Sequence, residues 1–237
     1  MSNKEKLTIH QTSTMIALLD GVFDGVVTYK DLAKKGDFGI GTFNQLDGEM
    51  IAFDGEFYHI ADGKASPISK DAKTPFAIMT TFYEDISYRV EKEMNREQLE
   101  TLMNELIPSP NLFYAVRIDG KFKEVKTRTV AKQEKPYPSM VDAAADQPTF
   151  TSSDVNGTLA GFYTPEYSSG IGVPGYHLHF IDEYKKEGGH VLDVSVQDVT
   201  IQICKKTKLN LNLSETSEFL SANLEDHDVE EEISTAE

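Results

Sequence analysis

The chain has 237 residues, of which 39% are hydrophobic and 10% aromatic, so it can form a folded core and its composition is not that of a disordered protein. Its formal net charge of −16 repels phosphate, and we therefore expect neither nucleic acid nor a membrane surface among its partners. A single cysteine, Cys204, excludes an intrachain disulfide framework and a cysteine-based zinc site. The N-terminus lacks an apolar signal core and no apolar run approaches the ~20 residues of a membrane helix, so we expect a cytoplasmic protein.

The first half of the chain mixes short helical and strand patterns. Residues 28–35 begin with Thr, carry an acid in the first turn and precede a glycine, which predicts a helix. Residues 37–64 are short apolar runs separated by Asp-Gly pairs, a pattern typical of strands joined by tight turns. After Asn95, Leu and Met recur at helical spacing up to residue 107, where prolines follow, and this predicts an amphipathic helix over residues 95–107.

The second half alternates mostly as strands. Residues 112–119 and 121–130 alternate on either side of Asp119–Gly120, which predicts a β-hairpin. Residues 131–150 contain three prolines and lose the alternation, which indicates a connection, and strand patterns return from residue 156. The last thirteen residues, EDHDVEEEISTAE, hold seven acids and no Lys or Arg.

These patterns predict a mixed, β-rich α/β fold in which two mostly antiparallel or mixed β-sheet regions pack together with a few helices. We expect an N-terminal mixed α/β sheet region over residues 1–140. A C-terminal β-rich metal-binding region with an acidic tail would then cover residues 141–237. A site formed by both regions would lie where they meet, a common place for a pocket.

Three of the six histidines fall within the sixteen residues GYHLHFIDEYKKEGGH at 175–190. Because alternate residues of a strand share a face, His177 and His179 project side by side. A polar, Gly-ended connection leads to His190, which would lie beside them if the two segments pair as a hairpin. Three imidazoles on one patch form the ligand set of a catalytic metal site, and imidazole suits zinc, Fe(II), Mn(II) or Ni(II).

Two other interpretations fit part of this pattern. A cupin-type metal-dependent oxygenase or isomerase also shows H-x-H followed by a glutamate, here Glu183, but it needs a later ligand histidine. The later histidine is His227, which lies in the acidic tail. The second alternative is a non-catalytic, acidic metal-binding module whose histidines are packing or storage ligands.

Four stretches carry a resemblance to a known family: TMIALLDGVFDG at 14–25, DFGIGTFNQLDGEM at 37–50, VKTRTV at 125–130 and GYHLHFIDEYKKEGGHVLD at 175–193. They follow one another in the family's order over nearly the whole chain, and the HLHF…GGHVLD block is specific. On these motifs the chain resembles the bacterial α-acetolactate decarboxylases. The resemblance implies a zinc-dependent enzyme of acetoin biosynthesis that converts 2-acetolactate, a small anionic 2-hydroxy-3-oxo acid, to acetoin and CO₂.

The resemblance also implies particular site residues and a homodimer. It assigns zinc binding to His177, His179 and His190, catalytic roles to Glu49 and Arg128, and pocket lining to Thr42. A glutamate near the C-terminus is expected to fold back to the site, and of Glu230, Glu231, Glu232 and Glu237 we select Glu237 from its distance to the end. From the residues alone, Glu49 is more typical of an exposed hairpin residue and Arg128 of a solvated strand face, and Arg117 competes with Arg128 for the basic role.

The chemistry of the implied reaction agrees with a metal site. Loss of CO₂ leaves an electron pair that must flow into the neighbouring carbonyl and form an enediolate, and a divalent cation can stabilise that charge as a Lewis acid. Since the substrate's own ketone accepts the electrons, no thiamine or pyridoxal cofactor is required. An anionic substrate in a protein of net charge −16 needs a locally positive site, which zinc and Arg128 would provide.

Overall fold

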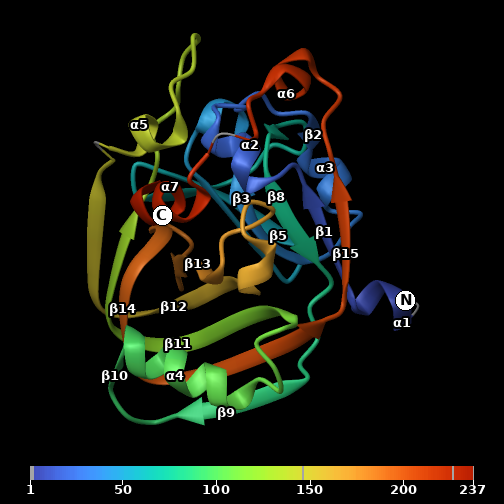
Figure 1. Cartoon of the computed structure of the whole chain (residues 1–237). Coiled ribbons are helices and arrows are strands. Elements are labelled where there is room, and N and C mark those ends of the chain that lie inside the picture. Colours follow the sequence, from blue (N-terminus) through green and yellow to red (C-terminus); the bar gives the residue numbers. More distant parts are fainter. Residues whose placement is uncertain (1–2, 146, 226, 237) are drawn as a thin grey trace.

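The computed structural model describes residues 3–145, 147–225 and 227–236. Two β-sheets lie face to face, with helices on their outer sides and at their edges (Figure 1). In the described residues the first sheet has seven strands, in the order β15-β1-β8-β3-β4-β5-β6. These strands are β1 (Thr8–Thr12), β3 (Phe38–Thr42), β4 (Glu49–Phe53), β5 (Glu56–Ala61), β6 (Lys64–Pro67), β8 (Ala77–Thr80) and β15 (Lys208–Asn212).

The second sheet contains the longest strands of the described chain. Its members are β9 (Ile86–Val90), β10 (Met94–Asn95), β11 (Phe113–Arg128), β12 (Thr149–Thr164), β13 (Gly175–Asp182) and β14 (Gly188–Lys206). Strand β14 pairs with β11 along its length, while its first residues also pair with β13, so the sheet curls back on itself. Two short strands, β2 (Val27–Thr28) and β7 (Lys73–Thr74), pair separately.

The helices are short apart from α4. They are α1 (Asn3–Lys6), α2 (Met15–Leu19), α3 (Tyr29–Leu32), α4 (Arg96–Leu106), α5 (Met140–Ala144), α6 (Ser217–Ser221) and α7 (Val229–Ala236), with the 3-10 turns η1 (Asn44–Leu46) and η2 (Glu166–Ser168). The predicted helix over 95–107 is confirmed, and Asn95 and Gln98 form a capping box at its start. The helix predicted over 28–35 is shorter, because α3 begins after its Thr28 cap and ends at Leu32. Within the described residues, no helix is both long enough and apolar enough to cross a membrane.

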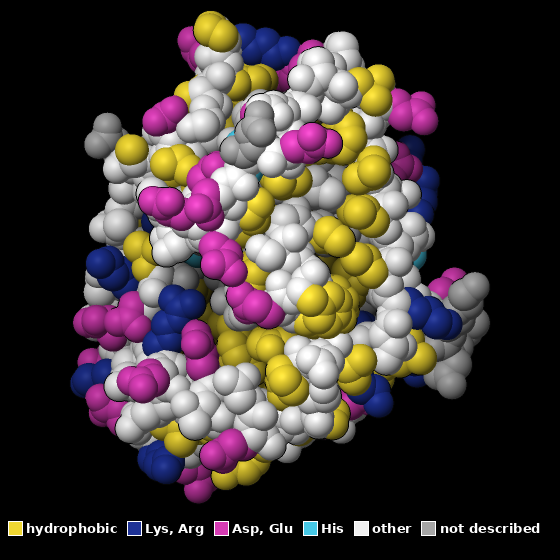
Figure 2. Space-filling model, in the orientation of Figure 1, with side chains coloured by type: hydrophobic (Ala, Val, Ile, Leu, Met, Phe, Trp, Pro, Cys, Tyr) yellow, Lys and Arg dark blue, Asp and Glu magenta, His cyan; other side chains and the backbone are white. Residues whose placement is uncertain are grey.

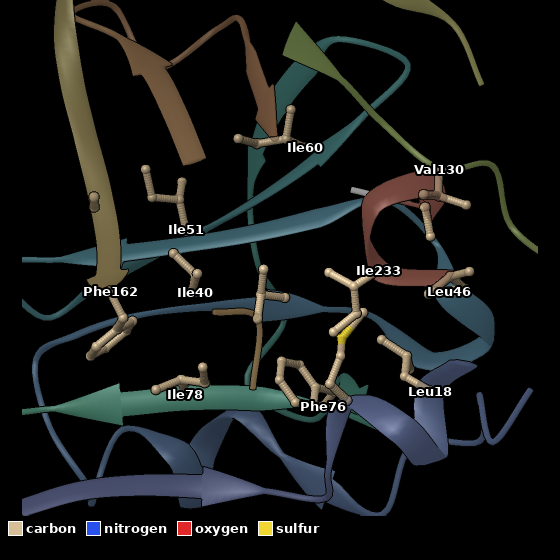
Figure 3. Close-up of a cluster of buried hydrophobic side chains, with 14 of the residues drawn as sticks. Leu18, Ile40, Leu46, Ile51, Ile60, Phe76, Ile78, Val130, Phe162 and Ile233 are labelled. Atoms are coloured by element: carbon tan, nitrogen blue, oxygen red, sulfur yellow. The ribbon is translucent and has the colours of Figure 1, made fainter. Parts of the chain in front are cut away.

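The main core lies between the two sheets. Ile40, Ile51 and Ile78 of the first sheet face Phe162 of the second, and each of these side chains is at most 3% exposed (Figure 3). Strands β3 and β4 are buried on both faces, because Met50 and Ala52 belong to a separate cluster on the outer side, where Tyr29 also packs. Burial on both faces explains why these central strands are almost continuously apolar in sequence.

The mixed, β-rich α/β class predicted from the sequence is confirmed. The two sheets are not consecutive halves of the chain, however. The second sheet takes β9 to β11 from before residue 140, and β15 returns from the C-terminal part to pair in parallel with β1. The expected division into residues 1–140 and 141–237 therefore does not separate the sheets.

The hairpin predicted at Asp119–Gly120 is wrong, because β11 runs through this pair without turning. Gly120 is paired on both sides, with Gly157 of β12 and with Val199 of β14. Its φ of +142° and the close approach of the Asp198 carbonyl explain why glycine stands here. The Asp-Gly pair that suggested a turn thus marks a tight packing point in a long strand.

We expect Gly120→Ala to lower the free energy of unfolding by about 3 kcal/mol, because the new Cβ adds overpacking to backbone strain. That Cβ would lie 2.3 Å from the Asp198 carbonyl oxygen. Gly55→Ala is the matched control, since Gly55 has a φ of +77° but no atom within 4 Å of its added Cβ. In the control only backbone strain is added, so its free energy of unfolding should fall by about 1–2 kcal/mol. Urea unfolding midpoints report the stability of both variants. Equal losses of stability in Gly120→Ala and Gly55→Ala would contradict the packing argument.

Candidate metal centre

The β13–β14 hairpin brings the three histidines of the 175–190 segment together, as the sequence predicted. His179 is paired directly with His190 across the hairpin, and His177 lies on the same face of β13. The ring centroids are 4.9 to 5.6 Å apart, and one nitrogen from each ring lies within 4.8 Å of the other two. All three side chains are buried. This cluster could hold one metal ion.

The orientation of His179 shows that the cluster suits a metal. Its Nδ1 lies 2.8 Å from the carbonyl oxygen of Met50 and must donate to it, which leaves Nε2 as the nitrogen with a free lone pair. Nε2 is buried and has no hydrogen-bond partner among the described residues. Such an atom is costly inside a protein unless an ion or another ligand binds it.

Burial keeps the imidazoles of His177 and His179 in the neutral form that binds metals. Loss of solvation, assisted by the positive charge of Arg128, lowers the pKa of His177 to about 3. Burial likewise holds the pKa of His179 well below its ordinary value, with the neighbouring His177 adding to the effect. The Nδ1 of His190 lies 3.2 Å from the Nε2 of His177, so these two rings already face each other.

The first sheet places Glu49 beside the cluster. Glu49 begins β4 opposite Thr42 of β3, is 7% exposed, and has its Oε2 3.5 Å from the Nε2 of His179. The Thr42 hydroxyl donates to the Gly48 carbonyl at 2.6 Å, and the Gly48 amide donates to the Val130 carbonyl. Thr42 thus lies at the site and holds the turn from which Glu49 projects.

Arg128 is the basic residue that the structure brings to the cluster. It lies in β11 opposite His190 of β14 and is 2% exposed. Its Nη1 donates to Gln147 Oε1 at 2.7 Å, its Nη2 donates to the Ala236 carbonyl at 2.6 Å, and Glu49 Oε1 lies 3.8 Å from Nη1. The competing Arg117 instead pairs with Asp119 of the second sheet and with Asp54 in the turn between β4 and β5.

A cavity of about 30 Å³ lies against these side chains. It has an apolar wall and a polar end, and its lining residues are Met15, Leu18, Gly41, Thr42, Leu46, Glu49, Phe76, Arg128, Val130, Met140, His177, His179 and His190. The apolar wall comes from segments far apart in the sequence, and sequence reasoning assigned no role to its members. Gln147 was missed as well, because a single amide in a Pro-rich connection gives no signal.

The remaining predicted residues lie in different places. Glu230 and Glu231 are exposed, and Glu232 contacts His227. Glu237 lies outside the described residues. Glu183, the ligand that a cupin-type site would need, is exposed in the turn after β13. The geometry therefore does not assemble the ligand set of the cupin alternative.

A buried cluster of three imidazoles, with a guanidinium and a carboxylate beside a small cavity, defines the molecule as an enzyme with a candidate metal centre. A family model described as alpha-acetolactate decarboxylase matches residues 9–226. The chain therefore belongs to the alpha-acetolactate decarboxylase family, whose activity is that of a carboxy-lyase.

Individual relatives agree with this assignment. The chain is 51% identical over 230 residues to the alpha-acetolactate decarboxylase of Bacillus subtilis, covering 97% of this chain and 90% of the relative. It is 44% identical over 230 residues to that of Klebsiella aerogenes, covering 97% and 88% of the two chains. A crystal structure of the Bacillus subtilis protein superimposes with a TM-score of 0.95 at 51% identity, covering 97% of this chain and 99% of the other.

His179→Gln should weaken metal binding by more than about 100-fold, because it removes a ligand rather than an outer contact. His10→Gln is the matched control, since His10 lies in β1 and is not part of the cluster. Metal per chain after gel filtration, measured by atomic emission, checks the expectation. Full occupancy in His179→Gln would show that this ring is not a ligand.

Proposed function

We propose that the chain catalyses the zinc-dependent decarboxylation of 2-acetolactate to acetoin and CO₂. The observation that carries the proposal is the buried cluster of His177, His179 and His190 with Arg128 beside it, in a chain of this family. Three buried imidazoles with room for a further ligand suit zinc, and we propose zinc as the ion held there. When bound, the ion would supply Lewis acidity toward negative charge on the substrate's carbonyl oxygen.

Arg128 is proposed to bind and orient the substrate carboxylate. Its Nη groups donate to the Gln147 amide oxygen and the Ala236 carbonyl, which are neutral acceptors. These partners orient the guanidinium, whose planar fork suits two parallel hydrogen bonds to a carboxylate. Beside the apolar wall the substrate carboxylate loses part of its hydration shell. This favours decarboxylation, because the CO₂ that leaves is neutral.

Proton transfer is proposed to fall to Glu49 and Glu237. Departure of CO₂ leaves an enediolate, and one proton must be delivered to the carbon that carried the carboxylate. Glu49 is supported by its burial and by its position 3.5 Å from His179. Glu237 is supported by Ala236, the residue before it, whose carbonyl lies on Arg128. An arginine is a poor acid, so Arg128 is left with the binding role.

The rest of the cavity is proposed to bind the alkyl part of the substrate. Thr42 lines the pocket at its polar end, where its hydroxyl oxygen can still accept a hydrogen bond. Met15, Leu18 and Phe76 form part of the apolar wall, which suits methyl groups and excludes water.

We further propose a cytoplasmic homodimer that acts on a small anionic acid and binds neither nucleic acid nor membranes. The net charge of −16 supports the last two points, and acidic side chains are prominent on the face shown in Figure 2. The dimer and the location rest on the resemblance and on the sequence.

The test is acetoin formation from 2-acetolactate under argon, with and without a chelator. We expect turnover that the chelator abolishes and that added zinc restores, because the reaction needs the cation but not oxygen. Turnover that requires oxygen would favour a metal-dependent oxygenase. Stable metal binding without turnover would favour a non-catalytic module.

Arg128→Ala should lower kcat/KM for acetolactate at least about 1,000-fold while leaving metal content unchanged, because it removes a carboxylate contact and not a ligand. Arg128→Lys keeps the charge but cannot form two parallel hydrogen bonds to a carboxylate. Its kcat/KM should therefore lie between those of wild type and Arg128→Ala. Arg117→Ala is the matched control and should stay near wild type. Loss of metal in Arg128→Ala, with normal activity after reloading, would contradict the assigned role.

A further inference from the structure

The C-terminal helix α7 packs beside the candidate site. It packs against α2 and α5 in the described structure (Figure 1). Ile233 is buried in the same cluster as Leu18, Leu46 and Phe76, which line the cavity, and Figure 3 shows it among them. Ala236 is fully buried, and its carbonyl accepts from Arg128.

In this arrangement α7 is closed. The cavity of about 30 Å³ has room for a water molecule or two and not for a branched keto acid. Most of the cavity wall consists of sheet strands and of segments packed on them, whereas α7 is a short terminal helix. If the site takes acetolactate, as proposed above, α7 is the element packed beside the wall that can move aside at least cost.

His227 joins α7 to the body of the molecule. Its Nδ1 lies 2.7 Å from an oxygen of Glu232, on α7 itself. Its Nε2 lies 3.3 Å from Oδ1 of Asp20, the residue that ends α2. The other oxygen of Asp20 accepts from the Asn223 amide at 2.9 Å, so the segment before α7 is tied to the same carboxylate.

The geometry around His227 favours a proton on both ring nitrogens. Carboxylates only accept hydrogen bonds, and a neutral imidazole has one N–H and can donate to only one of them. The imidazolium has two N–H donors and a positive charge between two negative ones. Loss of one proton leaves two carboxylates facing a ring that can satisfy only one of them.

Asp20 and Glu232 are the charged side chains that face His227 among the described residues. Burial alone would lower the pKa of His227, but these two carboxylates together outweigh burial and raise the pKa above its ordinary value. The stabilisation is therefore complete below the unfolded value of about 6.5 and is lost as the pH rises through the raised pKa.

We propose that His227, in its protonated form, is a positioning residue that holds α7 closed over the candidate metal centre. It acts at a distance: by anchoring the start of α7 to α2, it keeps Ile233 packed in the cluster that supports the apolar wall and the Ala236 carbonyl on Arg128. Raising the pH releases the anchor and shifts α7 toward an open state.

The direct test is hydrogen exchange of the α7 amides in the metal-loaded, full-length protein, followed by mass spectrometry from about pH 6 to about pH 9. After correction for intrinsic rates, wild-type protection of residues 229–236 should fall about tenfold or more across this range. His227→Gln should show low protection that does not vary with pH. His10→Gln, the matched control, should keep the wild-type response, and α4 should be unaffected in every variant.

A second variant moves the midpoint instead of removing the ring. Glu232→Gln removes the closer carboxylate, so the pH at which protection is lost should fall, while the transition itself remains because Asp20 is still present. A residue that only fills space would not produce this shift. Wild-type protection that is independent of pH would overturn the proposal, and so would an unchanged midpoint in Glu232→Gln.

Activity provides an independent readout. As the pH is raised, kcat/KM for acetolactate should begin to fall at a lower pH in Glu232→Gln than in wild type. The exchange experiment needs no substrate, so the two proposals can fail separately. Protection that titrates in a protein without acetoin formation would refute the proposed function alone, and normal turnover with unresponsive exchange would refute the role of His227 alone.

Discussion

The pairing of His179 with His190 across the β13–β14 hairpin is the contact on which the rest of the site depends. Because side chains alternate along a strand, this register also brings His177 to the cluster, and the pairing of β11 with β14 sets Arg128 opposite His190. A slip of one residue would turn the imidazoles to the other face of the sheet. Backbone hydrogen bonds thus determine the position of these four polar side chains, which hydrophobic packing alone would not bring into the core.

The first sheet contributes the remaining polar groups of the site. Consecutive residues of β4 serve the same site in different ways, since the Glu49 side chain reaches the cluster and the Met50 carbonyl orients His179. The site is therefore finished only when the two sheets pack against each other. Polar groups buried together act as one network, and here the members of that network come from opposite layers of the molecule.

The sequence was sufficient for features that depend on local spacing. The helix after Asn95, the β-rich class and the meeting of three histidines all followed from periodicity, and the structure confirms them. It was insufficient where a residue's meaning depends on distant neighbours: Gly120 gave the signal of a turn but serves a close strand contact, and Gln147 reaches Arg128 only through the tertiary fold. The grouping of strands into sheets, with β15 returning to β1, likewise left no local trace.

The placement of His227 has a consequence for how the molecule would respond to its own activity. Replacing a carboxylate with a C–H bond takes up a proton at each turnover, so in a weakly buffered volume from which the CO₂ escapes the reaction makes its surroundings more alkaline. The imidazolium between Asp20 and Glu232 depends on that same proton supply. Catalysis would then weaken the contact of His227 with Asp20 and Glu232 that holds α7 over the site. This would be a negative feedback within one chain that needs neither an effector molecule nor a second protein.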